Sequence, residues 1–189
     1  APGYTDIDMV SAVPAPVLEK IVAKIPVGRL GKADEIARGV VFLVADDAGF
    51  GTIRAGGLAL ATAAEGHCVR VPVSGLQADR WYAYRFETTG PGGVVSRTGR
   101  LRTAPAPGSS PDRLRFAYAS CQQLNDSWFV AHRAAAAEPD LDFFVHLGDY
   151  IYVSDTATLT VPQYRDCYRQ WKRQPLLRDL HAAVPMVMM

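Results

Sequence analysis

Residues 141–152 read LDFFVHLGDYIY, an apolar run that passes directly into a glycine, a carboxylate and two phenols. The run from Leu141 to Leu147 is predicted to be a buried strand that ends at Gly148-Asp149. Upstream, Leu114 to Ala119 has the same apolar character, and the alanine-rich residues 126–138 between the two runs have the composition of a helix. Strand, helix and strand in this order predict a β-α-β unit with parallel strands.

The ends of these two strands carry side chains that can bind a metal. Asp149 follows the second strand and Cys121 follows the first, and the carboxyl ends of parallel strands lie at one edge of a sheet. The phenol of Tyr152, three residues after Asp149, can join them. A thiolate, a carboxylate and a phenolate together favour a trivalent or borderline metal over magnesium alone. The alternative is structural: an aspartate in a turn, a buried cysteine and a tyrosine that packs its ring.

Residues 163–183 are predicted to form an amphipathic, basic helical stretch that Pro175 interrupts, and residues 185–189 begin another strand. Arg165 and Arg169 lie on this stretch together with further basic residues. They form either a solvated helix face or a surface that attracts an anionic substrate.

From His67 to Thr103 the apolar residues alternate, with turns at residues 75–79 and 90–93, which predicts antiparallel strands. Tyr82 lies six residues after Leu76, the spacing at which a tyrosine of a β-sandwich hydrogen-bonds the backbone of its own corner. Because three strands leave their edges exposed, further strands are expected from residues 54–66. The proline-rich residues 103–111 that follow predict a linker.

Before residue 46 the apolar residues have helical spacing, which predicts two helices between Val13 and Ala45 joined by a turn at Pro26 and residues 28–31. The second helix is expected to begin near Ala33, with Asp34 and Glu35 in its first turn. Each helix carries an apolar stripe that needs a partner surface, so we expect loose packing or self-association through exposed apolar faces.

Composition excludes several functional classes. The chain has 189 residues, of which 20 are Lys or Arg and 19 are Asp or Glu, and its net charge is +1. This charge predicts neither a nucleic-acid partner nor an anionic membrane surface. The sequence shows no apolar run long enough to span a membrane and no secretory signal at its start. The 3 cysteines have the spacing of neither a disulfide framework nor a structural zinc site. The compartment stays open.

Residues from about 55 to 189 resemble the N-terminal part of the alkaline phosphatase D family, calcineurin-like metallophosphoesterases with a small fibronectin-like domain in front. The resemblance rests on ordered motifs: VPVSGL at 71–76, YAYRF at 82–86, RTAP at 102–105, RFAYASCQ at 115–122, HLGDYIY at 146–152, QYR at 163–165 and LHAAVP at 180–185.

This resemblance implies a hydrolase of phosphomonoesters or phosphodiesters, with a small-molecule phosphate ester as substrate. Cys121, Asp149 and Tyr152 match positions that hold a ferric ion in the family, and the aspartate would bridge to calcium. Paired metals lower the pKa of a bound water and stabilise the attacking and leaving oxygens. The family's Trp-Asp-Asp-His-Glu segment, expected after Met189, is not in the chain, so we expect an incomplete site. Family members are usually periplasmic or secreted.

Residues 1 to about 53 resemble instead the C-terminal end of short-chain dehydrogenases/reductases of the acetoacetyl-CoA reductase type. The matching segments are PGY at 2–4, DMV at 8–10, IPVGRLG at 25–31, EIA at 35–37 and FL at 42–43. The resemblance implies a cytoplasmic, NADPH-dependent reductase of 3-oxoacyl thioesters. The dinucleotide fingerprint and the Ser/Tyr/Lys catalytic group of that family are not in the chain.

Together these features predict a mixed α and β chain of chimeric character. We expect a reductase-like N-terminal helical segment at 1–53, a fibronectin- or immunoglobulin-like antiparallel β domain at 55–104, a linker at 105–112 and the truncated α/β metallophosphoesterase domain at 113–189. The favoured function is phosphoester hydrolysis with iron and calcium. The alternatives are the reductase with NADPH and a non-catalytic β-sandwich interaction module.

Overall fold

The structure is a computed structural model that describes residues 5–6, 13–24, 29, 31–32, 39–62, 65–90, 92–124, 128–153 and 159–189. The chain divides into two compact units. One comprises residues 1–42, 57–71 and 86–95, and the other comprises residues 43–56, 72–85 and 96–189. Cys121, Asp149 and Tyr152 all belong to the second unit. In the described part of the chain, no helix has the length and apolar character needed to cross a membrane.

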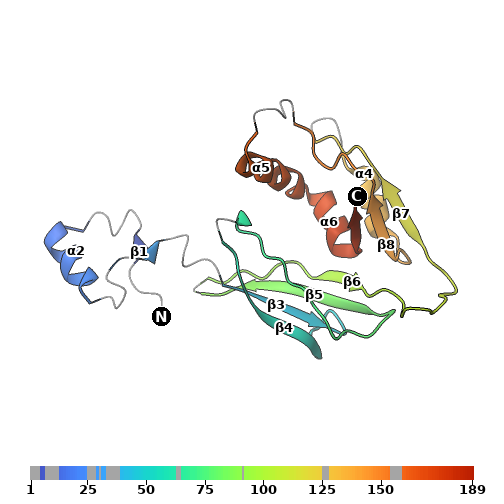
Figure 1. The fold of residues 1–189 in the computed structure, drawn as a ribbon, viewed down its shortest axis with the longest axis horizontal. Coiled ribbons are helices and arrows are strands. Elements are labelled where there is room, and N and C mark those ends of the chain that lie inside the picture. Colours follow the sequence, from blue (N-terminus) through green and yellow to red (C-terminus); the bar gives the residue numbers. More distant parts are fainter. Residues whose placement is uncertain are drawn as a thin grey trace. The chain divides into compact units, whose positions relative to one another are not determined.

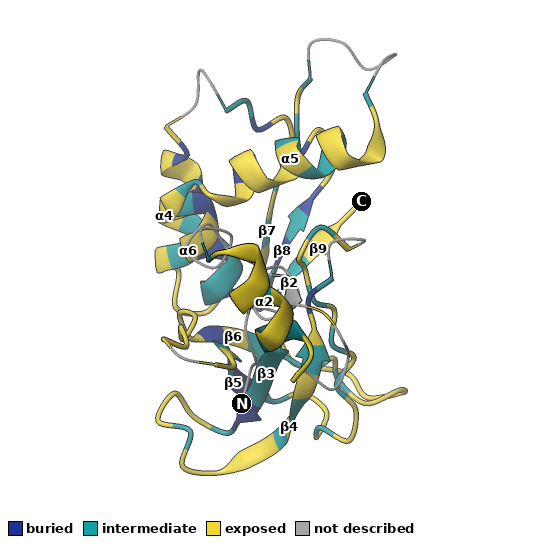
Figure 2. Ribbon diagram, turned by 90° about the vertical axis from the view of Figure 1, so that its left-hand side faces the viewer, coloured by how far each residue is buried: buried dark blue, intermediate teal, exposed yellow. Residues whose placement is uncertain are grey.

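The described N-terminal residues contain one helix and one short parallel pair of strands. Helix α2 (Ala15–Val22) confirms a helix in the first predicted segment, and Pro16 lies in its first turn, where its missing N–H costs no hydrogen bond. No residue of α2 is buried, as Figure 2 shows by its largely exposed surface. Strand β1 (Thr5–Asp6) pairs in parallel with β2 (Gly31–Lys32).

The prediction of a second helix up to Ala45 is wrong over its final seven residues. These residues form strand β3 (Gly39–Ala45), and residues 33–38 lie outside the described part of the chain. The segment reads GVVFLVA, a continuous apolar run whose periodicity fits a helix and a strand equally well. Its three valines are stiff at χ1 and favour the extended backbone, and pairing with the neighbouring strands of the sheet decides between the two.

Strand β3 belongs to a four-stranded sheet with β4 (Ile53–Leu60), β5 (Trp81–Thr88) and β6 (Gly99–Arg102), in the order β4-β3-β5-β6 (Figure 1). Strands β5 and β6 are antiparallel, with Tyr82 opposite Leu101. Strand β4 confirms the strand expected from residues 54–66. The strand predicted over residues 68–73 does not form, because Pro72 donates no hydrogen bond and β3 and β4 pair within the sheet.

The tyrosine corner predicted at Tyr82 is present. The hydroxyl oxygen of Tyr82 accepts a hydrogen bond from the backbone N–H of Gln77 at 2.8 Å. The turn between β3 and β4 is closed by Asp46, whose N–H donates to the carbonyl of Thr52 at 3.2 Å. The carboxylate of Asp46 pairs with Arg54 at 2.5 Å and with Arg80 at 3.2 Å, which joins the sheet to the segment before β5.

The second sheet confirms the predicted β-α-β unit and its following strand. Strands β7 (Phe116–Ala119), β8 (Phe143–His146) and β9 (Met186–Met188) are parallel and in chain order. Helix α4 (Val130–Ala137) connects β7 to β8, and α5 (Val161–Lys172) and α6 (Pro175–Ala183) precede β9 (Figure 1). The interruption predicted at Pro175 is therefore the boundary between α5 and α6.

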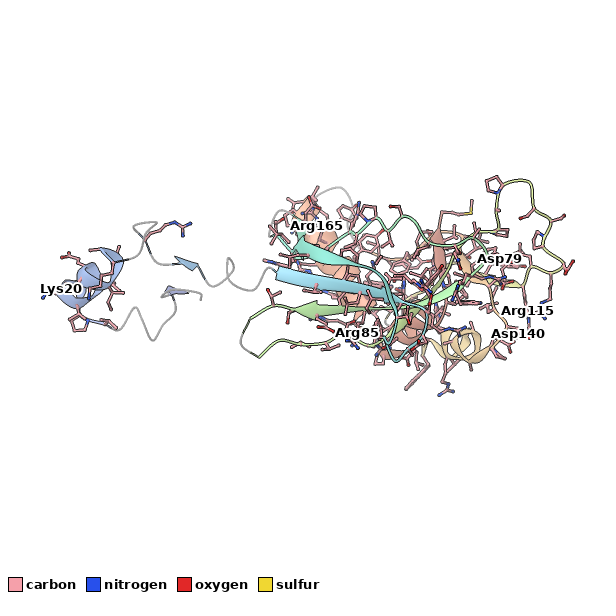
Figure 3. The ribbon with its side chains drawn as sticks, turned by 90° about the horizontal axis from the view of Figure 1, so that it is seen from below. Lys20, Asp79, Arg85, Arg115, Asp140 and Arg165 are labelled. Carbon is pink, nitrogen blue, oxygen red and sulfur yellow. The ribbon has the colours of Figure 1, made fainter. Side chains whose placement is uncertain are left out.

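One apolar core packs the helices against this parallel sheet. Its buried members are Leu141, Phe144, Leu180 and Val184, and alanines of α4 and β7 pack around them. A second cluster lies under α5 and contains Phe129, Tyr150, Trp171 and Leu177. Outside the core, Arg115 lies beside Asp140, with which its guanidinium pairs at 3.7 Å (Figure 3).

Candidate metal centre

The carboxyl ends of β7 and β8 place Cys121 next to Asp149. The parallel register pairs Ala119 with His146, and the N–H of Leu147 donates to the carbonyl of Ala119 at 2.8 Å. Two further backbone hydrogen bonds continue past the strand ends: Cys121 N–H to Gly148 O at 3.2 Å, and Gln122 N–H to Asp149 O at 3.3 Å. These backbone hydrogen bonds hold the two turns side by side.

Both candidate ligands have left-handed backbone conformations. Cys121 has φ 60° and Asp149 has φ 53°, and Gly148, the residue directly before Asp149, has φ 125°. A left-handed non-glycine residue costs about 1–2 kcal/mol, and Gly148 has a conformation that L side chains rarely adopt. Strain of this kind persists where the surroundings over-determine the conformation, and it is concentrated at functional sites.

The three side chains predicted to form a metal site meet at one oxygen atom. The Cys121 thiol donates to Asp149 Oδ2 at 3.4 Å, and the Tyr152 hydroxyl donates to the same oxygen at 3.1 Å. Cys121 and Asp149 are exposed and Tyr152 is 37% exposed, so a solute can reach the group from solvent. The prediction that these residues lie together is confirmed; their role as metal ligands stays a prediction.

Electrostatics at this group favours the protonated form of the Tyr152 phenol when no cation is present. The hydrogen bond with Cys121, burial and the hydrogen bond with Asp149 raise the pKa of the Tyr152 phenol, in that order of importance. A cation would replace the thiol and phenol protons, so its binding would release protons and weaken in acid.

The donor set fits a metal of intermediate or high charge. Sulfur, carboxylate and phenol oxygen at one point combine a soft ligand with two hard ones, as ferric iron accepts. Among the residues that the structure describes, no three histidine, cysteine, aspartate or glutamate side chains are placed to hold a metal ion, at this edge of the sheet or elsewhere. The group described here has two side chains of these types, Cys121 and Asp149, and its third donor is a phenol.

The predicted substrate-binding residues lie on α5. Arg169 is exposed and is ion-paired with Asp166 within the same helix, and Arg165 is half-buried. Their binding of an anionic substrate stays a prediction.

Beneath the three donors lies a buried polar network to which sequence reasoning assigned no role. The side chain of Gln122 bonds to the carbonyl of Tyr150 and to the ring of His132. The hydroxyl of Tyr150 bonds to Nε2 of His181 at 2.8 Å. The sequence held one indication of this network: Gln122 directly follows the candidate ligand Cys121, and Tyr150 directly follows the candidate ligand Asp149.

The histidines of this region are held neutral by their surroundings. Burial lowers the pKa of His132 and of His146, and it lowers the pKa of His181 to about 4. Burial also raises the pKa of the Tyr150 phenol, which therefore keeps its proton and shares a hydrogen bond with Nε2 of the neutral His181.

The parallel β-α-β unit carries a carboxylate and a thiol at its carboxyl edge, and the comparisons with known proteins assign the chain to a class. Two family descriptions match the chain: the N-terminal domain of PhoD-like phosphatases at residues 28–105, and the PhoD-like phosphatase domain at residues 116–189. The chain belongs to the PhoD-like phosphatase family.

Individual relatives agree with this assignment. The chain is 36% identical to alkaline phosphatase D of Bacillus subtilis (strain 168) over 160 residues, which cover 76% of the chain and 27% of that protein. A solved structure, "Structure of PhoD", matches with a TM-score of 0.75 at 33% identity and covers 81% of this chain and 32% of that one. The chain therefore spans about a third or less of the length of these relatives.

A short segment is similar to a different class of enzyme. Acetoacetyl-CoA reductase of Rhizobium meliloti (strain 1021) is 62% identical over 50 residues, which are 26% of this chain and 21% of the reductase. The PhoD-like N-terminal domain begins at residue 28, inside the segment predicted to be reductase-like, and β3 belongs to the four-stranded sheet.

Proposed function

We propose that the chain supplies part of the metal centre of a phosphomonoester or phosphodiester hydrolase. In this proposal Cys121, Asp149 and Tyr152 hold ferric iron, and Asp149 also faces calcium. The observation that carries the proposal is the convergence of the thiol and the phenol on Asp149 Oδ2, at 3.4 and 3.1 Å. The family supports the reaction class and a small phosphate ester as substrate.

When bound, the metals would lower the pKa of a water and stabilise the charge on the transferring phosphoryl group. The chain's own residues prepare this chemistry in two ways. Asp149 provides an oxygen that already faces two further donors, so little rearrangement is needed to enclose a cation. The exposure of Cys121 and Asp149 leaves room for a substrate at the same edge of the sheet.

The remaining parts of the proposal rest on charge and family. Arg165 and Arg169 would draw a phosphate ester toward the edge of the parallel sheet. The four-stranded sheet would be the fibronectin-like domain, and the protein would act outside the cytoplasm.

Ferric iron titration of the full chain tests the proposal. The chain spans 27% of the Bacillus relative. The proposal concerns only the chain's own part of the metal centre, so metal binding is measured and not phosphatase activity. We expect about one bound iron and a visible phenolate-to-iron charge-transfer band, which Tyr152→Phe removes. Tyr118→Phe, on an exposed tyrosine of β7, is the matched control and should keep the band. A colourless, iron-free protein would overturn the proposal.

Titration with NADPH separates the alternatives. The hydrolase proposal expects no binding of the nucleotide, whereas saturable binding would favour the reductase. Binding of neither iron nor NADPH would favour a non-catalytic interaction module.

A further inference from the structure

Gln122, the residue after the candidate ligand Cys121, is hydrogen-bonded to Tyr150, the residue after the candidate ligand Asp149. It directly follows Cys121, is only 4% exposed, and its side-chain Nε2 donates to the backbone carbonyl of Tyr150 at 2.9 Å. Tyr150 in turn directly follows Asp149. The amide therefore spans the two turns that carry the metal-binding donors, on the buried side of the sheet edge.

Chemistry fixes the orientation of this amide and of its second partner. A carbonyl only accepts hydrogen bonds, so the NH₂ group of Gln122 must face Tyr150 and its Oε1 must face His132. Oε1 lies 3.0 Å from His132 Nε2, so that nitrogen must carry the proton. His132 Nδ1 is then the bare nitrogen, and it is buried without a hydrogen-bond partner among the described residues. The network thus admits one tautomer and one amide orientation.

Helix α5 is also hydrogen-bonded to Gln122. The indole N–H of Trp171, a buried residue of α5, donates to the backbone carbonyl of Gln122 at 2.9 Å. His132 belongs to α4 and Tyr150 to the turn after β8, so Gln122 joins three separate segments. Both ends of the Gln122 amide are paired, although His132 Nδ1 is not, and buried polar groups paired in this way favour a single arrangement.

The two turns need such support, because Cys121 and Asp149 are both left-handed. We propose that Gln122 is a positioning residue that fixes the two turns, and with them the spacing of the Cys121 thiol and the Asp149 carboxylate, with His132 as its support. This inference rests on the proposed metal centre. It assigns Gln122 no contact with substrate or metal.

Three variants of the full chain test it. Gln122→Met keeps the length of the side chain and removes both hydrogen bonds. Gln122→Glu keeps the shape but cannot donate to the Tyr150 carbonyl. Gln123→Met is the matched control, because among the described residues the Gln123 side chain accepts from the neighbouring N–H of Leu124, at 3.1 Å, and does not bond across to the other turn.

Two readouts are taken on folded protein, well below the unfolding temperature. We expect Gln122→Met to weaken ferric iron binding by about 10–100-fold, the range found when outer-shell partners of metal ligands are removed. In the iron-free protein we expect faster amide hydrogen exchange at Cys121 and Gln122, while β7 and β8 keep their protection. Gln122→Glu should act in the same direction, and Gln123→Met should change neither readout.

The outcomes separate the two proposals. Wild-type iron affinity and wild-type exchange in both Gln122 variants would overturn the positioning role and leave the metal centre standing. If the wild-type chain binds no iron, the metal centre fails, and the exchange rates at Cys121 and Gln122 still decide the positioning role. If Gln122→Met does not fold, Gln122→Glu is the deciding variant. An NMR spectrum with the proton of His132 on Nδ1 would also overturn the inference.

Discussion

The two sheets of this molecule use polar side chains in opposite ways. The four-stranded sheet is held at its surface by arginine–aspartate pairs, such as Arg54 with Asp46 and Arg102 with Asp79, both at 2.5 Å. The region of the parallel sheet buries polar groups, among them the uncharged Gln122 and His132 and also the carboxylate of Asp142, which pairs with Arg102. Exposed ion pairs stabilise weakly and tolerate change, whereas a buried network is costly to break and selects one geometry.

Two aspartates make the same comparison at single residues. Asp79 has φ 52° and Asp149 has φ 53°, so both turns place a carboxylate on a left-handed residue. Asp79 pairs with the guanidinium of Arg102, which also pairs with Asp142. Asp149 faces a thiol and a phenol, which can exchange their protons for a cation. The same left-handed conformation therefore places Asp79 in a structural turn beside the four-stranded sheet and Asp149 in the candidate metal centre of the parallel sheet.

The largest difference is expected for apolar truncation. Leu180 is 0% exposed in the core of the parallel sheet, and Leu58 on β4 is 64% exposed. Leu180→Ala should lower the free energy of unfolding by about 2–5 kcal/mol, because it leaves a cavity. Leu58→Ala should change it by less than about 0.5 kcal/mol. Urea unfolding of both variants checks this prediction. An equal loss in the free energy of unfolding would contradict the difference in packing between Leu180 and Leu58.

The two left-handed aspartates should respond differently to the same substitution. Asp149→Asn should weaken ferric iron binding by more than the roughly 10–100-fold of an outer-shell change, because it removes the central anionic donor. Asp79→Asn should leave iron binding unchanged. Asparagine tolerates the left-handed conformation, so both chains should fold. Equal iron affinity in the two variants contradicts the assignment of Asp149.

Acid should destabilise the region of the parallel sheet through His181. Burial lowers the pKa of His181 to about 4, and the cationic Lys172 and the rings of His132 and His146 act in the same direction. Between the unfolded pKa, about 6.5, and pH 4 the unfolded state binds the extra proton, so the free energy of unfolding falls as pH falls.

His181→Gln should remove this share of the pH dependence, about 3 kcal/mol at pH 4 relative to pH 7. Glutamine can still accept from the Tyr150 hydroxyl, so the variant should fold. Unfolding curves at several pH values measure the difference between the two proteins. Parallel pH profiles would count against a neutral, buried His181.

A smaller effect is expected at the tyrosine corner of the four-stranded sheet. Tyr82→Phe deprives the Gln77 N–H of its acceptor, which lies at 2.8 Å, and should cost about 1 kcal/mol. Thermal unfolding measures it, and iron binding should not change. Reduced iron affinity in this variant would mean that the two sheets are not independent in function.

The smallest effect should come from the surface ion pair of Arg54 with Asp46. Arg54→Ala should lower the free energy of unfolding by at most about 1 kcal/mol, and by less at high salt, because the guanidinium is exposed. Unfolding at low and high ionic strength tests this. A loss that does not depend on salt would point to packing of the arginine stem.

Parts of this fold were predictable because the signal was local. Leu141 to Leu147 has the apolar character and the length of a buried strand, and Tyr82 has the spacing of a corner tyrosine. The segment from Gly39 to Ala45 was not predictable in this way. Its apolar residues fit two periodicities, and only pairing within the sheet shows that it is a strand.

By itself, the sequence determined the β-α-β unit and the three donors at its edge, since parallel strands bring their carboxyl ends together whatever lies between them. Only the tertiary structure decided that Gln122, His132, Tyr150 and Trp171 meet beneath those donors. The physical reason is that a buried hydrogen-bond network depends on the mutual placement of α4, α5 and two turns, and no periodicity in the chain encodes it.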